Sequence, residues 1–201
     1  MIYPKELEEL INFFMKLPSV GAKSAERLAL AVMKFSKEDA ENFSKSIQKL
    51  KKTLKDCIIC GHLTSTDICH ICSNSYRNHN VICIVEDYKS IFRFEKIGKY
   101  NGVYHVLNGL ISPIDGINPD DINISSLINR CNNIESENIE LIIALKPTLE
   151  GEATTMYITK ILKDKKIKIS RLSYGIPMGA EIDYLDALTL ERALADRKEV
   201  L

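Results

Sequence analysis

The sequence CIICGHLTSTDICHIC, from Cys57 to Cys72, divides this chain into two differently patterned parts. It holds two Cys-x-x-Cys pairs, Cys57 with Cys60 and Cys69 with Cys72, separated by eight residues. Each pair can direct two sulfurs at one ion, and four thiolates complete a tetrahedral zinc shell. Because that shell leaves no open position for water, the spacing predicts one structural Zn²⁺ per chain and no catalytic metal.

Other roles for the cysteines remain open from the sequence. His62 or His70 could replace one cysteine as a ligand, although the symmetry of the two pairs argues against it. A redox Cys-x-x-Cys, an iron–sulfur cluster and unliganded buried cysteines are further alternatives. Cys83 lies in an apolar run and Cys131 on an apolar helix face, so we expect both in the core.

Composition limits the class of protein. The chain has 201 residues, 45% of them apolar and 27% charged, with 27 basic and 27 acidic side chains and a pI near 6.9. These values fit one or two globular domains and exclude a disordered chain, a collagen, a coiled-coil rod and an overall polycation. The N-terminus shows no signal peptide and no window reaches the ~18 apolar residues of a membrane span, so we expect a cytoplasmic protein with reduced cysteines.

Residues 1–55 are predicted to be helical throughout. Apolar side chains recur at helical spacing in three segments, which hold Leu7, Leu10, Ile11 and Phe14; Ala25, Leu28, Ala29 and Val32; and Ala40, Phe43, Ile47, Leu50 and Leu54. Ser36 is placed to cap the third helix. Residues 1–56 hold 11 basic and 8 acidic side chains, a net charge of +3. The five lysines of residues 45–55 form either a solvated helix face or a nucleic-acid contact.

A short turn joins the first two predicted helices within residues 17–28, LPSVGAKSAERL. Gly21 permits backbone conformations that other residues resist, and free N–H groups at the start of a helix can bind a phosphate oxygen. Lys23 lies in that first turn and Arg27 one turn later on the same face, so together they can grip a nucleic-acid backbone. The segment resembles the helix-hairpin-helix of DNA repair proteins, although a plain αα-hairpin with an exposed lysine is an alternative.

From residue 80 onward the predicted strands and helices alternate. The run Val81–Val85 is apolar throughout, as expected for a strand buried on both faces of a parallel sheet. Further strands are predicted at residues 103–107, 139–145 and 167–172, and helices near residues 91–97, around Leu127, Ile128, Cys131 and Ile134, and on Ala187, Leu190 and Leu194. The second of these helices is predicted to start at Asn118-Pro119. This order predicts a multidomain α/β chain with a mostly parallel sheet.

Carboxylates follow two of these strands. Glu86 comes directly after the first strand, and Glu150 and Glu152 follow the strand at residues 139–145. Ligands of parallel sheets bind beyond the carboxyl ends of the strands, and this layout resembles the Toprim fold of topoisomerases, primases and small nucleases. The positions of that fold's metal-binding Asp-x-Asp are Lys146 and Thr148 here, so we expect neither Mg²⁺ nor catalysis. The three glutamates are interpreted as an acidic docking rim or a remnant; the alternative is that Glu150 and Glu152 simply favour the start of the helix that follows.

Taken together, these elements resemble the RecR family of bacterial recombination mediators over essentially the whole chain. The most specific stretches are residues 17–28, the four cysteines, and residues 110–117, 147–154 and 175–179. Two positions depart from the family pattern, because Lys146 stands in place of an asparagine and Ala22 in place of a proline. Lys146 makes Mg²⁺ binding in the Toprim-like region still less expected. Ala22 slightly loosens the start of the second predicted helix.

The resemblance implies a DNA-binding, non-enzymatic protein that acts with RecO and RecF to load RecA at single-stranded gaps. It implies assembly into dimers or ring-shaped tetramers on DNA and divides the chain into a helical module (1–55), a zinc finger (56–78), a Toprim domain (79–174) and a C-terminal segment (175–201). The residues implied are Cys57, Cys60, Cys69 and Cys72 for zinc, Lys23 and Arg27 for phosphates, and Glu86, Glu150 and Glu152 for RecO. The alternatives are a Mg²⁺-dependent Toprim nuclease or nucleotidyl-transfer enzyme, and a zinc adaptor without DNA affinity.

The zero net charge is a sum of opposed regions. Residues 160–171 hold six basic residues and one acidic residue (+5), whereas residues 111–142 hold one arginine and six acidic residues (−5). The balance therefore excludes only a uniformly basic DNA binder. We expect residues 160–171 either to extend the DNA surface or to form a solvated helix.

Overall fold

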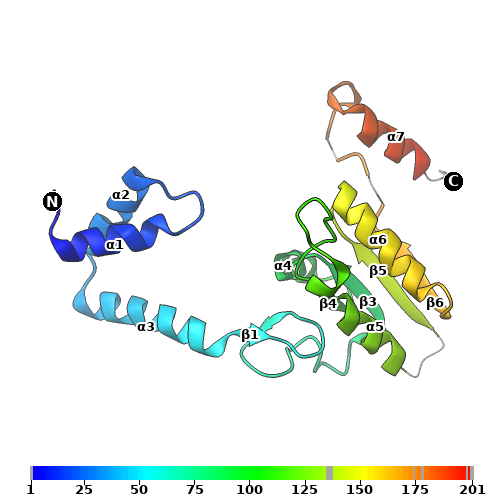
Figure 1. Cartoon of the computed structure of the whole chain (residues 1–201), viewed down its shortest axis with the longest axis horizontal. Coiled ribbons are helices and arrows are strands. Elements are labelled where there is room, and N and C mark those ends of the chain that lie inside the picture. The colour runs from blue at the N-terminus through cyan, green and yellow to red at the C-terminus, as the bar shows by residue number, and fades with distance from the viewer. Residues whose placement is uncertain (1, 135–137, 174, 178, 198, 200–201) are drawn as a thin grey trace. The chain divides into compact units, whose positions relative to one another are not determined.

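A computed structural model describes residues 2–134, 138–173, 175–177, 179–197 and 199 of the chain (Figure 1). The chain divides into two compact units, Met1–Thr53 and Leu54–Leu201. Glu135 and Glu137, two of the six acidic residues in 111–142, and Met178, within the stretch 175–179, lie outside the described residues. No helix in the described part of the chain is long and apolar enough to cross a membrane.

Three helices form the first unit: α1 (Lys5–Met15), α2 (Ala22–Val32) and α3 (Lys37–Thr53). Its core is small and lies between α1 and α2, where Ala25 and Ala29 are fully buried beside Ile11. Ser36 caps α3 as predicted, because its hydroxyl oxygen accepts the Asp39 N–H at 3.0 Å. The predicted all-helical start of the chain is therefore confirmed.

Two apolar groups of this unit are not buried in the way their spacing predicted. Leu28 is 39% exposed, because Ala25 and Ala29 form the face of α2 that meets α1. The apolar stripe of α3, which consists of Phe43, Ile47 and Leu50, is 40%, 52% and 55% exposed, and α3 has no buried residue. Periodicity identified the helices correctly, but it could not show how little of this stripe the unit covers, where the Phe43 ring packs edge-on against Phe35.

The second unit is built on a four-stranded parallel sheet with the strand order β4-β3-β5-β6 (Figure 1). The strands are β3 (Asn78–Val85), β4 (Gly102–Val106), β5 (Ile139–Ala144) and β6 (Ile167–Arg171). β3 lies inside the sheet, and its Ile82, Ile84 and Val85 are fully buried, as expected for a strand covered on both faces. The α/β architecture with a parallel sheet is confirmed.

Helices α4 (Tyr88–Ile97), α5 (Ile124–Asn133) and α6 (Leu149–Leu162) alternate with the strands. The start predicted for α5 at Asn118 is wrong. Asn118 instead caps a separate 3-10 helix, η1 (Pro119–Asp121), in a capping box with Asp121. Extended backbone at Ile122 separates η1 from α5, so the strong start signal belongs to the short helix alone.

The C-terminal segment holds the 3-10 turn η2 (Ile182–Tyr184) and α7 (Ala187–Ala195), the helix predicted from Ala187, Leu190 and Leu194. No residue of α7 is buried. Arg192 of α7 lies 3.0 Å from Glu152 of α6, so an ion pair helps to attach the helix where apolar burial is lacking.

The cysteine-rich segment packs directly on the sheet. Its short strands β1 (Lys55–Asp56) and β2 (Leu63–Thr64) pair antiparallel, and its four cysteines belong to the same buried core as the sheet. The Val106 N–H of edge strand β4 donates to the Cys60 carbonyl at 2.8 Å. Gly61 follows with a φ of 72°, and a Cβ there would come within 3.2 Å of the Val106 carbonyl oxygen. A segment too short for a core of its own therefore shares that of the sheet.

A second connection to the sheet runs through Arg77, which follows the cysteines. Its guanidinium pairs with Glu95 of α4 through both terminal nitrogens. The Tyr104 hydroxyl donates to the same carboxylate at 2.7 Å. Burial opposes ionisation of Glu95, but the hydrogen bonds from Arg77 and Tyr104 outweigh it and hold the pKa of this carboxyl below its usual range.

Replacing Glu95 by glutamine should lower the free energy of unfolding by about 2 kcal/mol, because Arg77 stays largely buried and loses its charged acceptor. Chemical denaturation measures this difference. Since the folded-state pKa of Glu95 is depressed, its stabilising contribution is present at neutral pH and is lost as the pH falls through that pKa. The difference in the free energy of unfolding between the unaltered protein and Glu95→Gln should therefore become smaller once the pH falls below ~4.3, the pKa of an unperturbed glutamate.

Lys168→Ala is the control for this change. It removes an exposed ion pair with Glu140 in the same unit, which is expected to cost less than about 0.5 kcal/mol. Equal losses of stability in Glu95→Gln and Lys168→Ala would contradict the structural role given to Glu95.

Candidate zinc site and nucleic-acid interface

The four cysteines meet at one buried point. The sulfurs of Cys57, Cys60, Cys69 and Cys72 all lie within 4.8 Å of one another. The backbone N–H groups of His62, Cys69 and Cys72 donate to the sulfurs of Cys60, Cys57 and Cys69 at 3.4, 3.3 and 3.4 Å. Such N–H···S bonds orient thiolate ligands and stabilise their charge. The group fits one tetrahedral zinc ion with all four positions filled by the protein.

The chemistry of the sulfurs also suits a metal. Hydrogen bonds with Cys60 and Cys72 lower the pKa of Cys69. Hydrogen bonds to Cys69 and Cys72, together with burial, raise the pKa of Cys60. Zinc would supply the positive charge that lets the thiols lose their protons.

The two nearby histidines flank this cluster without joining it. The buried ring of His62 packs edge-on against Phe92 and His70, with ring centroids 5.3 and 6.2 Å apart. Across the described ranges, the four cysteines are the only group of three or more possible metal ligands that lie this close together. The structure therefore favours the all-cysteine set over one that includes a histidine.

The α1–α2 turn exposes the start of α2. Gly21 precedes this helix in an ordinary extended conformation (φ −82°, ψ 171°), and the left-handed residue of the turn is Ser19 (φ 63°). The expectation that Gly21 supplies unusual backbone geometry is therefore wrong. A larger side chain is sterically allowed here, because no atom lies within 4 Å of the place a Cβ would take, and no side chain caps the helix. The N–H groups of the first turn consequently face an open approach.

Two predicted DNA-contacting cations stand beside this helix start. Lys23 and Arg27 are both exposed and line one shallow hollow together with Lys34 and Glu26. The Glu26 carboxylate accepts the Tyr3 hydroxyl at 2.8 Å, and this hydrogen bond raises the pKa of Tyr3. Three cations and one hydrogen-bonded carboxylate leave the hollow with a positive charge.

The Toprim-like strand ends bring a lysine and a glutamate together. Lys146 Nζ lies 2.9 Å from Glu86 Oε1. The hydrogen bond to Glu86, and the charges of Glu86, Glu150 and Asp87, raise the pKa of Lys146. Gly151 permits this arrangement, because a Cβ there would collide with the Lys146 carbonyl oxygen. An ammonium group therefore occupies the acidic end of the sheet.

Glu152 faces other partners than Glu86. It lies 3.0 Å from Arg192 and 3.5 Å from Arg171. The predicted acidic rim is thus divided into Glu86 and Glu150 around Lys146, and Glu152 at the attachment of α7. The ion pairs of Arg171 and Lys168 also offset part of the basic charge counted in residues 160–171. Sequence spacing gave no signal for these pairings, since their partners are remote in the chain.

Known proteins share this layout in full. The chain matches the RecR helix-hairpin-helix at residues 7–51, the RecR four-cysteine zinc finger domain at 54–74, the Toprim domain at 80–173 and the RecR C-terminal region at 175–198. Two proteins named Recombination protein RecR, from Staphylococcus aureus strains MRSA252 and Newman, are each 46% identical over 200 residues, which cover 100% of both chains.

A helix-hairpin-helix, a four-cysteine zinc finger and a Toprim domain in this order define a recombination protein with a DNA-binding module. The chain belongs to the RecR family.

Reduced protein should contain about one zinc per chain by elemental analysis. Cys69→Ser should lose the metal and lower the melting temperature of the second unit, because the cysteines share the core of the sheet. Cys131→Ala, which changes a buried cysteine outside the cluster, should keep its zinc. Full zinc content in Cys69→Ser, or none in the unaltered protein, would refute the site.

Proposed function

We propose that this chain is a non-enzymatic DNA-binding mediator, which acts with RecO and RecF to promote RecA loading at single-stranded gaps. The observation that carries the proposal is the α1–α2 hairpin, where an open helix start and two exposed cations lie together. Membership of the RecR family supports the role in recombination. Such a protein would work in the cytoplasm, at the nucleoid.

The hairpin can bind a phosphate because it combines free helix-start N–H groups with the charges of Lys23 and Arg27. The first-turn N–H groups of α2 carry the positive end of the helix dipole and have no side-chain cap. Lys23 and Arg27 add two full charges beside them. None of these groups reads a base edge, so we expect binding to single- and double-stranded DNA without sequence preference.

Lys23→Ala and Arg27→Ala should each weaken DNA binding at low salt. Each should also reduce the slope of log K against log salt by about 0.9 on duplex DNA, the contribution of one phosphate contact. Fluorescence anisotropy over a salt series measures both quantities. Lys5→Ala on α1 removes an equal charge from a lysine that pairs with Glu9, and it should behave as the unaltered protein does. Unchanged affinity and slope in the Lys23→Ala/Arg27→Ala double variant would refute the hairpin contact.

Gly21→Asp separates helix stability from phosphate binding. The extended backbone and the open space at Gly21 accept an aspartate, which would cap α2 by taking up its first-turn N–H groups. We expect an unchanged or higher melting temperature and a loss of DNA affinity of about tenfold or more, because the carboxylate occupies the phosphate position. Retained DNA affinity in a stable Gly21→Asp protein would show that phosphates bind elsewhere.

The Toprim domain is proposed to be a docking surface and not a catalytic centre. The support is the ammonium of Lys146 against Glu86, since a divalent cation at this place would meet an existing positive charge. Glu86, Glu150 and Glu152 are proposed to contact RecO. Mg²⁺-dependent DNA cleavage that disappears in Glu86→Ala would establish the alternative, a Toprim nuclease.

The chain is further proposed to assemble into dimers or ring-shaped tetramers. The exposed apolar stripe of α3 supports this, because a contiguous apolar surface on a helix is typical of a protein–protein contact. Burial of Phe43, Ile47 and Leu50 against a second copy would supply the cover that the first unit lacks.

A further inference from the structure

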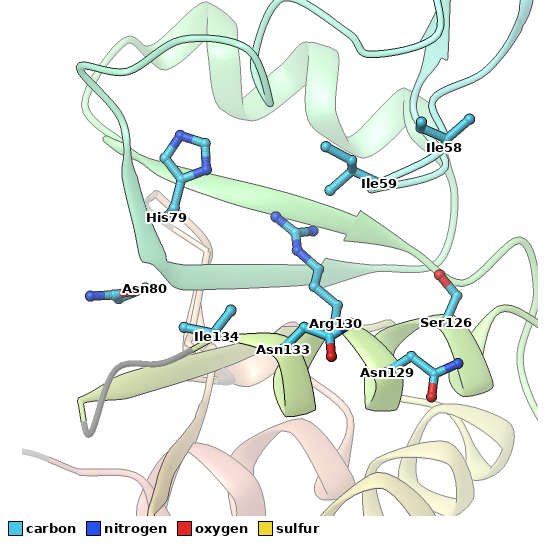
Figure 2. A pocket seen from close by; sticks show the side chains of 9 residues that line it. All are labelled: Ile58, Ile59, His79, Asn80, Ser126, Asn129, Arg130, Asn133 and Ile134. Atoms are coloured by element: carbon cyan, nitrogen blue, oxygen red, sulfur yellow. The ribbon is translucent and has the colours of Figure 1, made fainter.

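A hollow of about 490 Å³ opens on the second unit between the cysteine-rich segment, the start of β3 and helix α5 (Figure 2). Arg130 reaches across it from α5, toward His79 of β3 and Ile59 of the cysteine-rich segment. We call it the arginine hollow. Its volume falls within the range of pockets that take small molecules or single residues of a polymer.

The side chains that line the arginine hollow include hydrogen-bond donors and no carboxylate. Arg130 donates from Nη1 to the Tyr104 carbonyl at 2.7 Å, which fixes the guanidinium and uses one of its five N–H donors. Asn129 and Asn133 add amides, and none of the nine lining residues is acidic. His79 is held in place as well, because its Nε2 lies 3.0 Å from the Asn74 carbonyl and must donate to it. This set of groups is complementary to a phosphate.

A second hollow beside it has the opposite charge. It shares Ile58 and Ser126 with the arginine hollow and is lined by Asp56, Asp120 and Asp121. The charge of the surface therefore changes sign at Ile58 and Ser126. A polyanion seated on Arg130 is repelled on this side and directed toward His79.

An exposed aromatic ring stands close to His79 in the chain. Tyr76 lies three residues before it, in the same turn as the Asn74 carbonyl that holds the histidine ring. The Tyr76 side chain is 91% exposed, so burial in the core does not explain it. An open aromatic ring three residues before a side chain of the hollow is available to stack an unpaired base, as aromatic rings do in proteins that bind single strands.

We propose that the arginine hollow is a second DNA contact and that it takes a single strand. Arg130 binds one phosphate, the isoleucines and asparagine amides contact the attached sugar and base, and Tyr76 stacks a neighbouring base. A duplex cannot use the ring in this way, because its bases are already stacked and paired. The inference rests on the proposed DNA-binding function, but on none of the hairpin residues.

A pair of isosteric variants on α5 provides the main test. Asn133→Asp places a negative charge at the arginine hollow, whereas Asn132→Asp adds the same charge to an exposed neighbour on the same helix that does not line it. With a labelled oligothymidylate, anisotropy should show Asn133→Asp weakened about five- to tenfold and Asn132→Asp near the unaltered protein. Equal binding by the two variants would overturn the proposal.

Two further variants identify the roles within the site. Arg130→Gln should reduce the salt slope on the oligothymidylate by about 0.7, the contribution of one phosphate of a single strand. Tyr76→Ala should weaken the same complex roughly fivefold or more and leave duplex binding unchanged. Equal effects of Tyr76→Ala on both forms of DNA would overturn the stacking assignment. Zinc content and melting temperature confirm that each variant is folded.

The same variants separate this site from the hairpin and from a nucleotide pocket. The hairpin claim fails if Lys23→Ala/Arg27→Ala binds normally, whereas the arginine hollow fails if Asn133→Asp binds normally. ATP and inorganic triphosphate replace the oligonucleotide in a parallel titration. One contrary result is that Asn133→Asp weakens the binding of ATP or triphosphate and leaves oligonucleotide binding unchanged. That result would assign the hollow to free nucleotides and overturn the single-strand proposal.

Discussion

The docking of the cysteine-rich segment on edge strand β4 is the constraint on which the second unit depends. One backbone hydrogen bond, from Val106 N–H to the Cys60 carbonyl, joins the two where Gly61 allows a close approach. The four cysteines are buried in the same hydrophobic core as the residues of the sheet. Because a bound zinc would fix the shape of this segment, it would also hold Cys60 against the end of edge strand β4 and hold Ile58 and Ile59 as a wall of the arginine hollow.

Elements with strong local signals could be predicted from the sequence, whereas the partners of side chains could not. Apolar runs located β3 to β6, and cysteine spacing located the zinc ligands, because both signals lie within a few residues. The exposure of Leu28 and of the α3 stripe could not be predicted from periodicity, since burial depends on which side chains of another helix pack against them. The capping signal at Asn118 was real but belonged to η1. Arg130 gave no signal at all, because its hollow joins three segments that are distant in sequence.

The two proposed DNA contacts differ in the kind of strand they can hold. The hairpin offers a helix start and two cations, which act on any phosphate backbone. The arginine hollow has apolar walls, and the exposed ring of Tyr76 lies three residues before its His79; a stacking ring is useful only when bases are unpaired. A protein with both could remain on DNA across the boundary between duplex and single strand, which is the structure present at the edge of a gap.

The close approach at Gly151 limits which residues the start of α6 can hold. A glycine inside a helix normally costs stability, by about 1 kcal/mol relative to alanine. Here any larger residue would push the Lys146 backbone away from α6. The middle position of Glu150-Gly151-Glu152 is therefore fixed by space, whereas the flanking glutamates are held by their charges, Glu150 near Lys146 and Glu152 paired with Arg192. A substitution at the start of α6 is thus limited by volume at residue 151 and by charge at the two positions beside it.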